Sequence, residues 1–167
     1  MTKLKIQTGT ENKILRTRSE RIGKIDKKTK KLIDNMIETL LAQQGLGLAA
    51  PQVGKNIRII LARLNYETAE EMIKPLINPE ILFTSKETYI AEEGCLSLPN
   101  CFKPVERFKM IRVRFDDVRG GSQILELEDL NARIIQHEVD HLNGVLFVDR
   151  VKEEDMALDE PSKHEII

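Results

Sequence analysis

The sequence predicts an α+β fold, in which antiparallel or mixed β-sheets pack around a central metal-binding helix and a further helix lies near the N-terminus. Apolar residues recur at helical spacing between positions 32 and 41, and strand-like segments fill much of residues 57–127. A second helical segment follows and carries the pattern His-Glu-x-x-His. With 167 residues, 41% of them hydrophobic, the chain is expected to form one domain over residues 1–167, ending in an irregular tail at 151–167.

The N-terminal helix is predicted from six apolar residues that would line one of its faces. Asp26 is the expected N-cap, because its carboxylate can accept a hydrogen bond from the first turn, and Gly45 is the expected stop. This face is expected to be buried. The periodic residues are Leu32, Ile33, Met36, Ile37, Leu40 and Leu41.

A run of small residues, GLGLAAPQVG at 45–54, separates this helix from the first predicted strand. Glycine and alanine bury little surface, and glycine permits unusual backbone angles. The run therefore predicts either a tight helix-to-strand connection or a loop whose bare backbone approaches a ligand, with Gln52 aimed into the site.

Strands are expected where β-compatible residues cluster or alternate with polar ones. In residues 111–116 apolar and charged side chains alternate, as in a half-buried strand. The pair Gly120-Gly121 predicts a hairpin turn after it. The other predicted strands are residues 57–61, 75–82, 89–92 and 124–127.

The second helix is expected to have Asp129 as its N-cap and Gly144 just past its end. On this helix His137 and His141 stand four residues apart. Both imidazoles therefore reach the same side and can share one divalent cation, with Glu138 beside them.

A catalytic metal typically takes three protein ligands and keeps a position for water, whereas a structural metal takes four. Cys95 is the best candidate for the third ligand, because Gly94 permits close backbone approach and a thiolate is a strong, soft ligand. Cys101 is the rival, and by default a small hydrophobic residue. The remaining histidine, His164, lies in the tail and is expected to be a solvated surface residue.

The net charge of −1 hides an asymmetry, because residues 1–31 hold 11 Lys/Arg against 3 Asp/Glu while the other 136 hold 15 against 24. The basic segment could face nucleic acid, a ribosome or an anionic membrane, or could be solvated surface. No aromatic residue interleaves with it, so direct, sequence-specific nucleic-acid binding is not expected. Without a signal peptide, a membrane-spanning segment or a disulfide framework, the chain is expected in the cytoplasm.

Three separated motifs resemble those of the peptide deformylase family, in the same order. They are GLGLAAPQ at 45–52, EGCLS at 93–97 and QHEVDH at 136–141. Each motif alone is suggestive, and the three together are highly specific. The likeness extends over residues 14–150.

The resemblance implies an activity and a cofactor. The activity is removal of the formyl group from the N-terminal formylmethionine of newly made polypeptides, with release of formate. The resemblance also implies that Cys95, His137 and His141 hold one divalent metal ion. Fe²⁺ is the expected metal in the cell, and Zn²⁺, Ni²⁺ or Co²⁺ can occupy the same site.

Amide hydrolysis at such a site also follows from the chemistry of the residues. A metal lowers the pKa of its bound water, and Glu138 can take a proton from that water and pass it to the leaving amine. By resemblance, the donors to the oxyanion are the side-chain amide of Gln52, the backbone N–H of Leu96 and the metal itself.

The substrates implied by the resemblance are N-formylmethionyl nascent peptides. Leu46, Gly47 and Gly94 resemble the family's segments that pair with the peptide backbone, a mode of binding that tolerates varied sequences. Ile134, three residues before His137 and so on the same helical side, is expected to wall an apolar pocket for the methionine side chain.

Two features depart from the family pattern. Phe102 stands where bacterial members often carry an arginine near the path of the peptide. The tail after Arg150 has 6 Asp/Glu against 2 Lys/Arg, so it cannot supply the basic C-terminal helix by which some members dock on ribosomes. Ribosome contact, if made, is expected through the basic N-terminal segment.

Two other functions are compatible with a His-Glu-x-x-His helix. A metallopeptidase uses the same helix, although such enzymes usually recruit His or Glu as the third ligand. A non-catalytic, metal-stabilised binding domain is the other. The presence of Gln52, Glu138 and a full ligand set argues against it.

Overall fold

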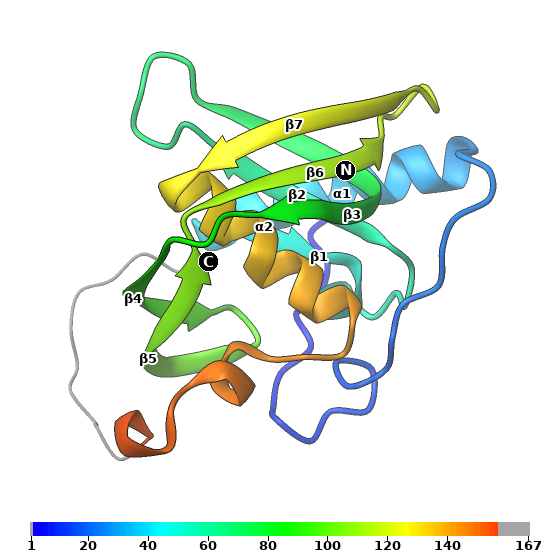
Figure 1. The fold of residues 1–167 in the computed structure, drawn as a ribbon. Coiled ribbons are helices and arrows are strands. Elements are labelled where there is room, and N and C mark those ends of the chain that lie inside the picture. The colour runs from blue at the N-terminus through cyan, green and yellow to red at the C-terminus, as the bar shows by residue number, and fades with distance from the viewer. Residues whose placement is uncertain (1, 157–167) are drawn as a thin grey trace.

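A computed structural model describes residues 2–156 and shows two α-helices and two antiparallel sheets in that range (Figure 1). One sheet has five strands in the order β1-β2-β3-β6-β7, and the other pairs β4 with β5. The predicted α+β class with a central helix is confirmed. In chain order the elements are α1 (Lys27–Gln43), β1 (Gly47–Ala49), the 3-10 helix η1 (Ala50–Val53), β2 (Ile59–Leu64), β3 (Met72–Thr84), β4 (Thr88–Cys95), β5 (Leu98–Phe108), β6 (Met110–Asp116), β7 (Ser122–Glu128), α2 (Asp129–Leu142) and the short helices η2 (Phe147–Arg150) and η3 (Glu153–Asp155).

The five-stranded sheet lies between the two helices, with α2 against one face and α1 against the other (Figure 1). Alternation along β2 explains this arrangement. Ile60 and Ala62 belong to the apolar cluster that includes α2, whereas Ile59 and Leu61 belong to the cluster that includes α1. Each face of the strand thus supplies one core.

Helix α2 is the centre of the molecule, because the β4-β5 hairpin packs on the side that the large sheet leaves open (Figure 1). Every residue of this helix from Ala132 to Leu142 is buried. Polar side chains on a helix buried all round must therefore find partners inside the protein or serve a ligand.

The start of α1 is as predicted, and its end differs. The Asp26 carboxylate accepts a hydrogen bond from the backbone N–H of Thr29 at 2.8 Å. The prediction that Gly45 stops the helix is wrong, because α1 ends at Gln43 and Gln44 adopts the left-handed conformation with φ 55°. Its backbone N–H then donates to the carbonyls of Leu40 and Leu41 in the last turn, so a glycine was not needed for this cap.

The start of α2 also differs from the prediction. Asp129 is not the N-cap but the first helical residue, and the cap position belongs to Glu128, which makes no side-chain capping bond. The reason is that β7 runs directly into α2, and the Asp129 N–H donates to the Lys109 carbonyl instead. Gly144 follows the end of the helix as predicted, with φ 75°, where a Cβ would lie 2.6 Å from the Arg16 carbonyl oxygen.

Strand positions were predicted better than strand lengths. Segments 57–61, 75–82 and 89–92 overlap β2, β3 and β4, which are shifted or longer, and the glycine hairpin joins β6 to β7. Two strands were missed. The small-residue run at 45–54 forms β1 and η1 rather than a loop, and β5, with its two prolines, is a strand because it pairs with β4.

The predicted irregular tail at 151–167 falls only partly within the described residues, where it holds η3. Residues 157–167, and with them His164, lie outside. Within the described part of the chain, no helix is long and apolar enough to span a membrane.

Candidate active site

Three polar side chains of α2 lie between β1 and the end of β4. His137, Glu138 and His141 are each at most 1% exposed. Their spacing of one and four residues places them on one side of the helix. The helix therefore delivers two imidazoles and one carboxylate to the same buried space.

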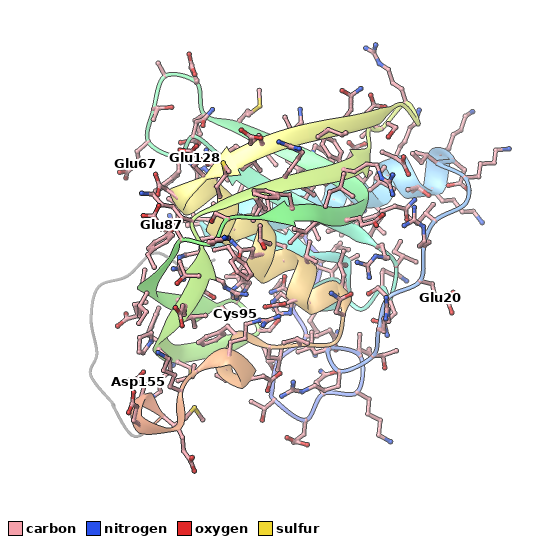
Figure 2. The ribbon with its side chains drawn as sticks, in the orientation of Figure 1. Glu20, Glu67, Glu87, Cys95, Glu128 and Asp155 are labelled. Atoms are coloured by element: carbon pink, nitrogen blue, oxygen red, sulfur yellow. The ribbon has the colours of Figure 1, made fainter. Side chains whose placement is uncertain are left out.

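The last residue of β4, Cys95, which is labelled in Figure 2, completes a candidate metal site. The Cys95 Sγ lies 3.2 Å from the His141 Nε2, and one ligand atom from each of Cys95, His137 and His141 lies within 4.8 Å of the others. Cys101 is not part of this group. One thiolate and two imidazoles form a donor set for a divalent transition metal with an open position for water.

The hydrogen-bonding of these side chains fits a bound cation. Among the described residues, six buried side-chain N or O atoms lack a partner, and four of them belong to this site. They are the His137 Nε2, both carboxylate oxygens of Glu138 and the His141 Nδ1. Buried polar atoms are nearly always hydrogen-bonded, so the His137 Nε2 and the two Glu138 oxygens point to a ligand and water held there. In His141 the nitrogen beside Cys95 is Nε2, and Nδ1 is the other ring nitrogen.

The predicted oxyanion donors lie beside the cysteine. Gln52 in η1 is fully buried, and its Oε1 accepts a hydrogen bond from the Ala49 N–H at 2.7 Å. This bond fixes the amide so that its Nε2 lies 3.6 Å from the Cys95 Sγ and 3.2 Å from the Ser97 Oγ. Leu96 stands in the tight turn between β4 and β5, directly after Cys95.

At both predicted substrate-binding glycines, close contacts leave no room for a side chain. A Cβ on Gly47 would lie 2.3 Å from the Glu138 Oε1, and one on Gly94 would lie 2.4 Å from the Phe102 ring. Gly47 therefore lets the edge strand β1 pass directly over the carboxylate. Gly94 lets the Phe102 ring, at the position that departs from the family pattern, pack on β4.

The other two predicted substrate-binding residues lie in the apolar cluster between α2 and the large sheet. Leu46 is 1% exposed and Ile134 is fully buried. The structure brings them near the same helix, and their contact with substrate stays a prediction.

Sequence reasoning assigned no role to the residues that hold His137 in place. The Glu93 Oε2 lies 2.9 Å from the His137 Nδ1, and the same carboxylate accepts two bonds from Arg107 at 2.9 Å and one from Arg133 at 2.6 Å. All four side chains are at most 4% exposed. A carboxylate bonded to the outer nitrogen of a ligating histidine fixes the ring and raises its basicity.

The network continues to Asp140 on α2. Its carboxylate accepts bonds from Arg107 at 2.5 Å and from Arg150 at 2.5 and 2.6 Å. Spacing offered a signal for these residues, because Glu93 lies two positions before Cys95 on the same face of β4, and Arg133 lies one helical turn before His137. These two spacings can be read from the sequence. The pairing of Glu93 with Arg107 and Arg133 cannot, because the three residues belong to different elements.

Burial governs the charges at the site. It raises the pKa of the Cys95 thiol to about 12 and that of Glu138 well above its usual range, and nearby carboxylates act in the same direction. Burial, with the charges of His137 and Arg107, lowers the pKa of His141. Glu93 behaves in the opposite way, because bonds from His137 and Arg107 overcome its burial and hold its pKa well below the usual range. A bound cation would favour the thiolate and the carboxylate.

A buried Cys-His-His cluster beside an unpartnered carboxylate, on an α+β framework, defines a metal-dependent hydrolase. Comparison with known proteins identifies the family. The family model for polypeptide deformylase matches residues 4–157.

Curated relatives agree over most of the chain. A peptide deformylase of Synechocystis sp. is 44% identical over 154 residues, which are 92% of this chain and 82% of the relative. One from Thermotoga neapolitana is 48% identical over 139 residues, 83% of this chain and 82% of the relative.

Solved structures share the fold as well as the sequence. The crystal structure of the Thermotoga maritima peptide deformylase superposes with a TM-score of 0.85 at 42% identity, covering 91% of this chain and 99% of that one. The Synechococcus elongatus enzyme in complex with actinonin gives 0.85 at 41% identity, covering 90% and 81%. The chain belongs to the peptide deformylase family, the hydrolases that remove the N-terminal formyl group from newly made polypeptides.

Proposed function

We propose that Cys95, His137 and His141 hold one divalent cation and that Glu138 moves the proton when the formyl amide of an N-formylmethionyl peptide is hydrolysed. The observation that carries this is the fully buried Glu138 carboxylate, which has no partner among the described residues and lies beside the metal cluster. When bound, the cation acts as a Lewis acid and lowers the pKa of water.

Glu138 is suited to both halves of the proton transfer. Its burial raises its pKa above the usual range, so its carboxylate is a stronger base than one in water. The same group, once protonated, can deliver the proton to the leaving nitrogen. Gly47 keeps the space directly beside it free of a side chain.

Gln52 and Leu96 are the proposed donors to the developing oxyanion. The bond from the Ala49 N–H to the Gln52 Oε1 leaves the Nε2 protons on the side of Cys95. A donor held in advance needs no reorganisation during the reaction, which is why such groups favour the transition state. The Leu96 N–H lies in the turn that follows the metal ligand.

The peptide is proposed to bind along β1, which is the edge strand of the large sheet. An edge strand offers backbone N–H and C=O groups that accept an extended peptide whatever its sequence. Leu46 and Gly47 would supply these groups on one side and Gly94 on the other. Ile134 is the proposed wall of the methionine pocket, and Phe102 is proposed to lie near the path of the peptide without adding a charge there.

The metal in the cell is proposed to be Fe²⁺. The chain is proposed to form a single catalytic domain and to lie in the cytoplasm, where a reducing environment preserves the Cys95 thiolate. Oxygen attacks either the iron or the thiolate. Enzyme loaded with Fe²⁺ should therefore lose activity in aerated buffer while the Ni²⁺ form persists. Equal half-lives for the two forms would contradict this assignment.

Contact with the ribosome is proposed through lysines of the basic N-terminal segment. Five lysines just before and within the first turns of α1 are exposed: Lys24, Lys27, Lys28, Lys30 and Lys31. Replacing Lys27 and Lys31 by glutamate should reduce co-sedimentation with ribosomes and leave turnover of a short peptide unchanged. Unchanged co-sedimentation would exclude this surface.

The reaction is tested by formate release after purification without oxygen and analysis of bound metal. Formyl-Met-Ala-Ser should yield one formate per peptide, and unformylated Met-Ala-Ser should remain uncleaved. Cleavage between Met and Ala in either peptide would instead identify a metallopeptidase.

A further inference from the structure

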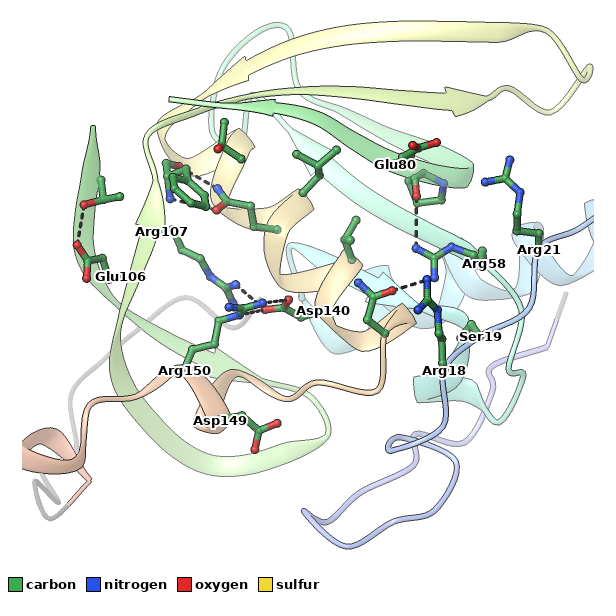
Figure 3. Close-up of a pocket in the computed structure, with 18 residues that line it drawn as sticks. Arg18, Ser19, Arg21, Arg58, Glu80, Glu106, Arg107, Asp140, Asp149 and Arg150 are labelled. Carbon is green, nitrogen blue, oxygen red and sulfur yellow. Dashed lines mark hydrogen bonds and ion pairs between the residues drawn. The ribbon is translucent and has the colours of Figure 1, made fainter. Parts of the chain in front are cut away.

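A second concave site lies along α2, and none of the three residues of the metal cluster lines it (Figure 3). It is a cavity of about 960 Å³. The α2 residues that line it are Gln136, Val139, Asp140 and Asn143. Val139 and Asn143 fall on the opposite side of the helix from His137 and His141, and Asp140 lies between the two faces. The cavity is large enough for a small organic ligand.

Arginines gather at one end of this cavity, where Arg18, Arg21 and Arg58 are its lining residues beside Ser19 and Glu80 (Figure 3). Arg18 and Arg21 belong to the basic N-terminal segment and are exposed, whereas Arg58 is only 8% exposed. The cavity therefore has two exposed positive charges, on Arg18 and Arg21, and one buried positive charge, on Arg58.

The Arg58 guanidinium is buried with neutral partners. It donates to the backbone carbonyls of Leu142 at 3.2 Å and Pro79 at 3.4 Å, and to the Asn143 Oδ1 at 3.0 Å. Burial, with the charges of Arg18 and Arg21, lowers its pKa. A buried cation without a paired carboxylate is a strong attractor for an anion.

Of the acidic residues that line the cavity, Glu80 lies at this end, and its charge acts on Arg58 (Figure 3). Glu80 is bonded to Arg114 of β6 at 2.6 Å. Asp140, towards the other end, is bonded to both Arg107 and Arg150. Arg18, Arg21 and Arg58 therefore keep a net positive charge at this end of the cavity.

Ser19 supplies an independent observation. It is 5% exposed, lines the cavity, and its hydroxyl has no hydrogen-bond partner among the described residues. Its backbone N–H donates to the Leu142 carbonyl at 2.8 Å, which fixes the residue beside Arg58. A buried hydroxyl with unused hydrogen-bonding capacity indicates a polar ligand.

We propose that Arg18, Ser19, Arg21 and Arg58 form a site, named here the arginine pocket, that binds the phosphate group of a small molecule, either free phosphate or a phosphate monoester. Guanidinium forks match phosphate oxygens in pairs, and a serine hydroxyl donates one further bond. In an ester, the organic part would lie along apolar side chains that line the cavity, Ile81, Phe108 and Val139.

The depth of the pocket favours a small ligand over a nucleic acid. Arg58 and Ser19 are both more than nine-tenths buried, whereas only Arg18 and Arg21 lie on the open surface. A polynucleotide backbone would use the two exposed arginines and leave Ser19 without effect. The contribution of Ser19 therefore separates the two kinds of ligand.

The test is titration of the metal-loaded protein with inorganic phosphate and with AMP, followed by ³¹P NMR and calorimetry. Ser19→Ala should weaken binding about tenfold, the loss of one hydrogen bond to a charged group. The double variant Arg18→Gln/Arg21→Gln should weaken binding by roughly a hundredfold or more. Arg119→Gln, an exposed arginine in the β6-β7 turn outside the cavity, is the matched control and should bind as wild type.

Tighter binding of AMP would identify an ester as the ligand, and equal binding would identify free phosphate. The proposal is overturned if neither probe binds, or if the double variant binds phosphate as wild type does, which would place the anion at the metal. It is also overturned if Arg119→Gln loses affinity, or if a short RNA binds more tightly than AMP and is insensitive to Ser19→Ala.

Discussion

The two sides of α2 differ in how their polar groups are satisfied. On the side of β1, His137, Glu138 and His141 are buried and hold four atoms without a partner among the described residues. Towards β5 and η2, Asp140 is nearly as buried, yet its carboxylate accepts several charged hydrogen bonds. On the side of α2 where chemistry is expected, polar groups thus lack hydrogen-bond partners. On the side that joins the helix to β5 and η2, the polar groups are fully hydrogen-bonded.

Glu93 links the two sides. One of its carboxylate oxygens contacts His137, the candidate ligand, and both oxygens accept bonds from arginines. Glu93 therefore belongs to the framework and is placed to orient the candidate metal site. Removing a group from the satisfied side should affect stability first. Removing a polar group on the side of β1 should first lower the metal content or the turnover.

The largest effect is expected at the third metal ligand. Cys95→Ser should lose bound metal and with it all measurable formate release, because a hydroxyl is a poor substitute for a soft thiolate. Cys101→Ser is the matched control, since Cys101 lies outside the cluster, and it should keep metal content and turnover. Metal analysis beside activity checks both, and loss of metal from the Cys101 variant alone would reverse the assignment.

Glu93→Gln should be the most destabilising change in the network. It leaves the buried Arg107 and Arg133 short of a counter-charge, and breaking a buried pair costs about 3–5 kcal/mol of unfolding free energy. Metal affinity should also fall, by about 10–100-fold, because His137 loses its orienting carboxylate. Glu126→Gln, which removes the exposed partner of Arg112, is the control and should cost under about 1 kcal/mol.

The pH dependence of this variant has a defined sign. The folded-state pKa of Glu93 is depressed, so its contribution to stability is complete above the ordinary value of 4.5 and is lost as the pH falls through the folded pKa. The difference in unfolding free energy between wild type and Glu93→Gln should therefore be constant near neutrality and shrink in acid. A difference that grew as the pH fell would contradict the depressed pKa.

Gly47→Ala should slow the reaction and keep the metal. The new Cβ would lie 2.3 Å from the Glu138 Oε1, so the carboxylate or β1 must move. A displacement of about 1 Å at a catalytic group lowers the rate by roughly a hundredfold. Gly23→Ala is the control, because its new Cβ would have no atom within 4 Å, and it should leave kcat unchanged. A normal rate for Gly47→Ala would contradict the expected sensitivity of the reaction to the position of Glu138.

The smallest effect is expected at Gln136, which is buried but not part of the cluster. Its side chain accepts a bond from the Phe108 N–H at 3.0 Å and donates one to the Phe108 carbonyl at 2.8 Å, and so joins α2 to β5. Gln136→Ala should lower the unfolding free energy by about 1–3 kcal/mol and leave turnover near wild type. Chemical denaturation beside formate release checks this, and a selective loss of turnover would move Gln136 into the active site.

The sequence was sufficient where a signal is local. Helical periodicity placed α1, and the His-Glu-x-x-His pattern placed α2. The four-residue spacing of His137 and His141 put two candidate ligands on one face, and the glycine beside Cys95 marked the third candidate. Asp26 was found as an N-cap because a cap needs only its own first turn.

The sequence was insufficient where a feature depends on a distant partner. Strand β5 contains prolines and polar residues, and is a strand because β4 lies beside it. The contact of Gly47 with Glu138 joins residues far apart in the chain, as does the convergence of Glu93, Arg107 and Arg133. Such pairings are set by the packing of whole elements, which no local spacing encodes.

One side of α2 is expected to perform chemistry while the other maintains the structure, and a pair of isosteric variants separates the two roles. Metal content, kcat and the free energy of unfolding are measured for Glu138→Gln and Asp140→Asn at equal metal occupancy. Glu138→Gln should retain metal and stability and lose about 10²–10⁴ in kcat, since the carboxylate that moves the proton is gone. Asp140→Asn should lose roughly 1.5–3 kcal/mol of stability with kcat near wild type, because bonds to Arg107 and Arg150 are weakened. A metal-replete Glu138→Gln working within about tenfold of wild type, or an Asp140→Asn that loses turnover without losing stability, would contradict the account.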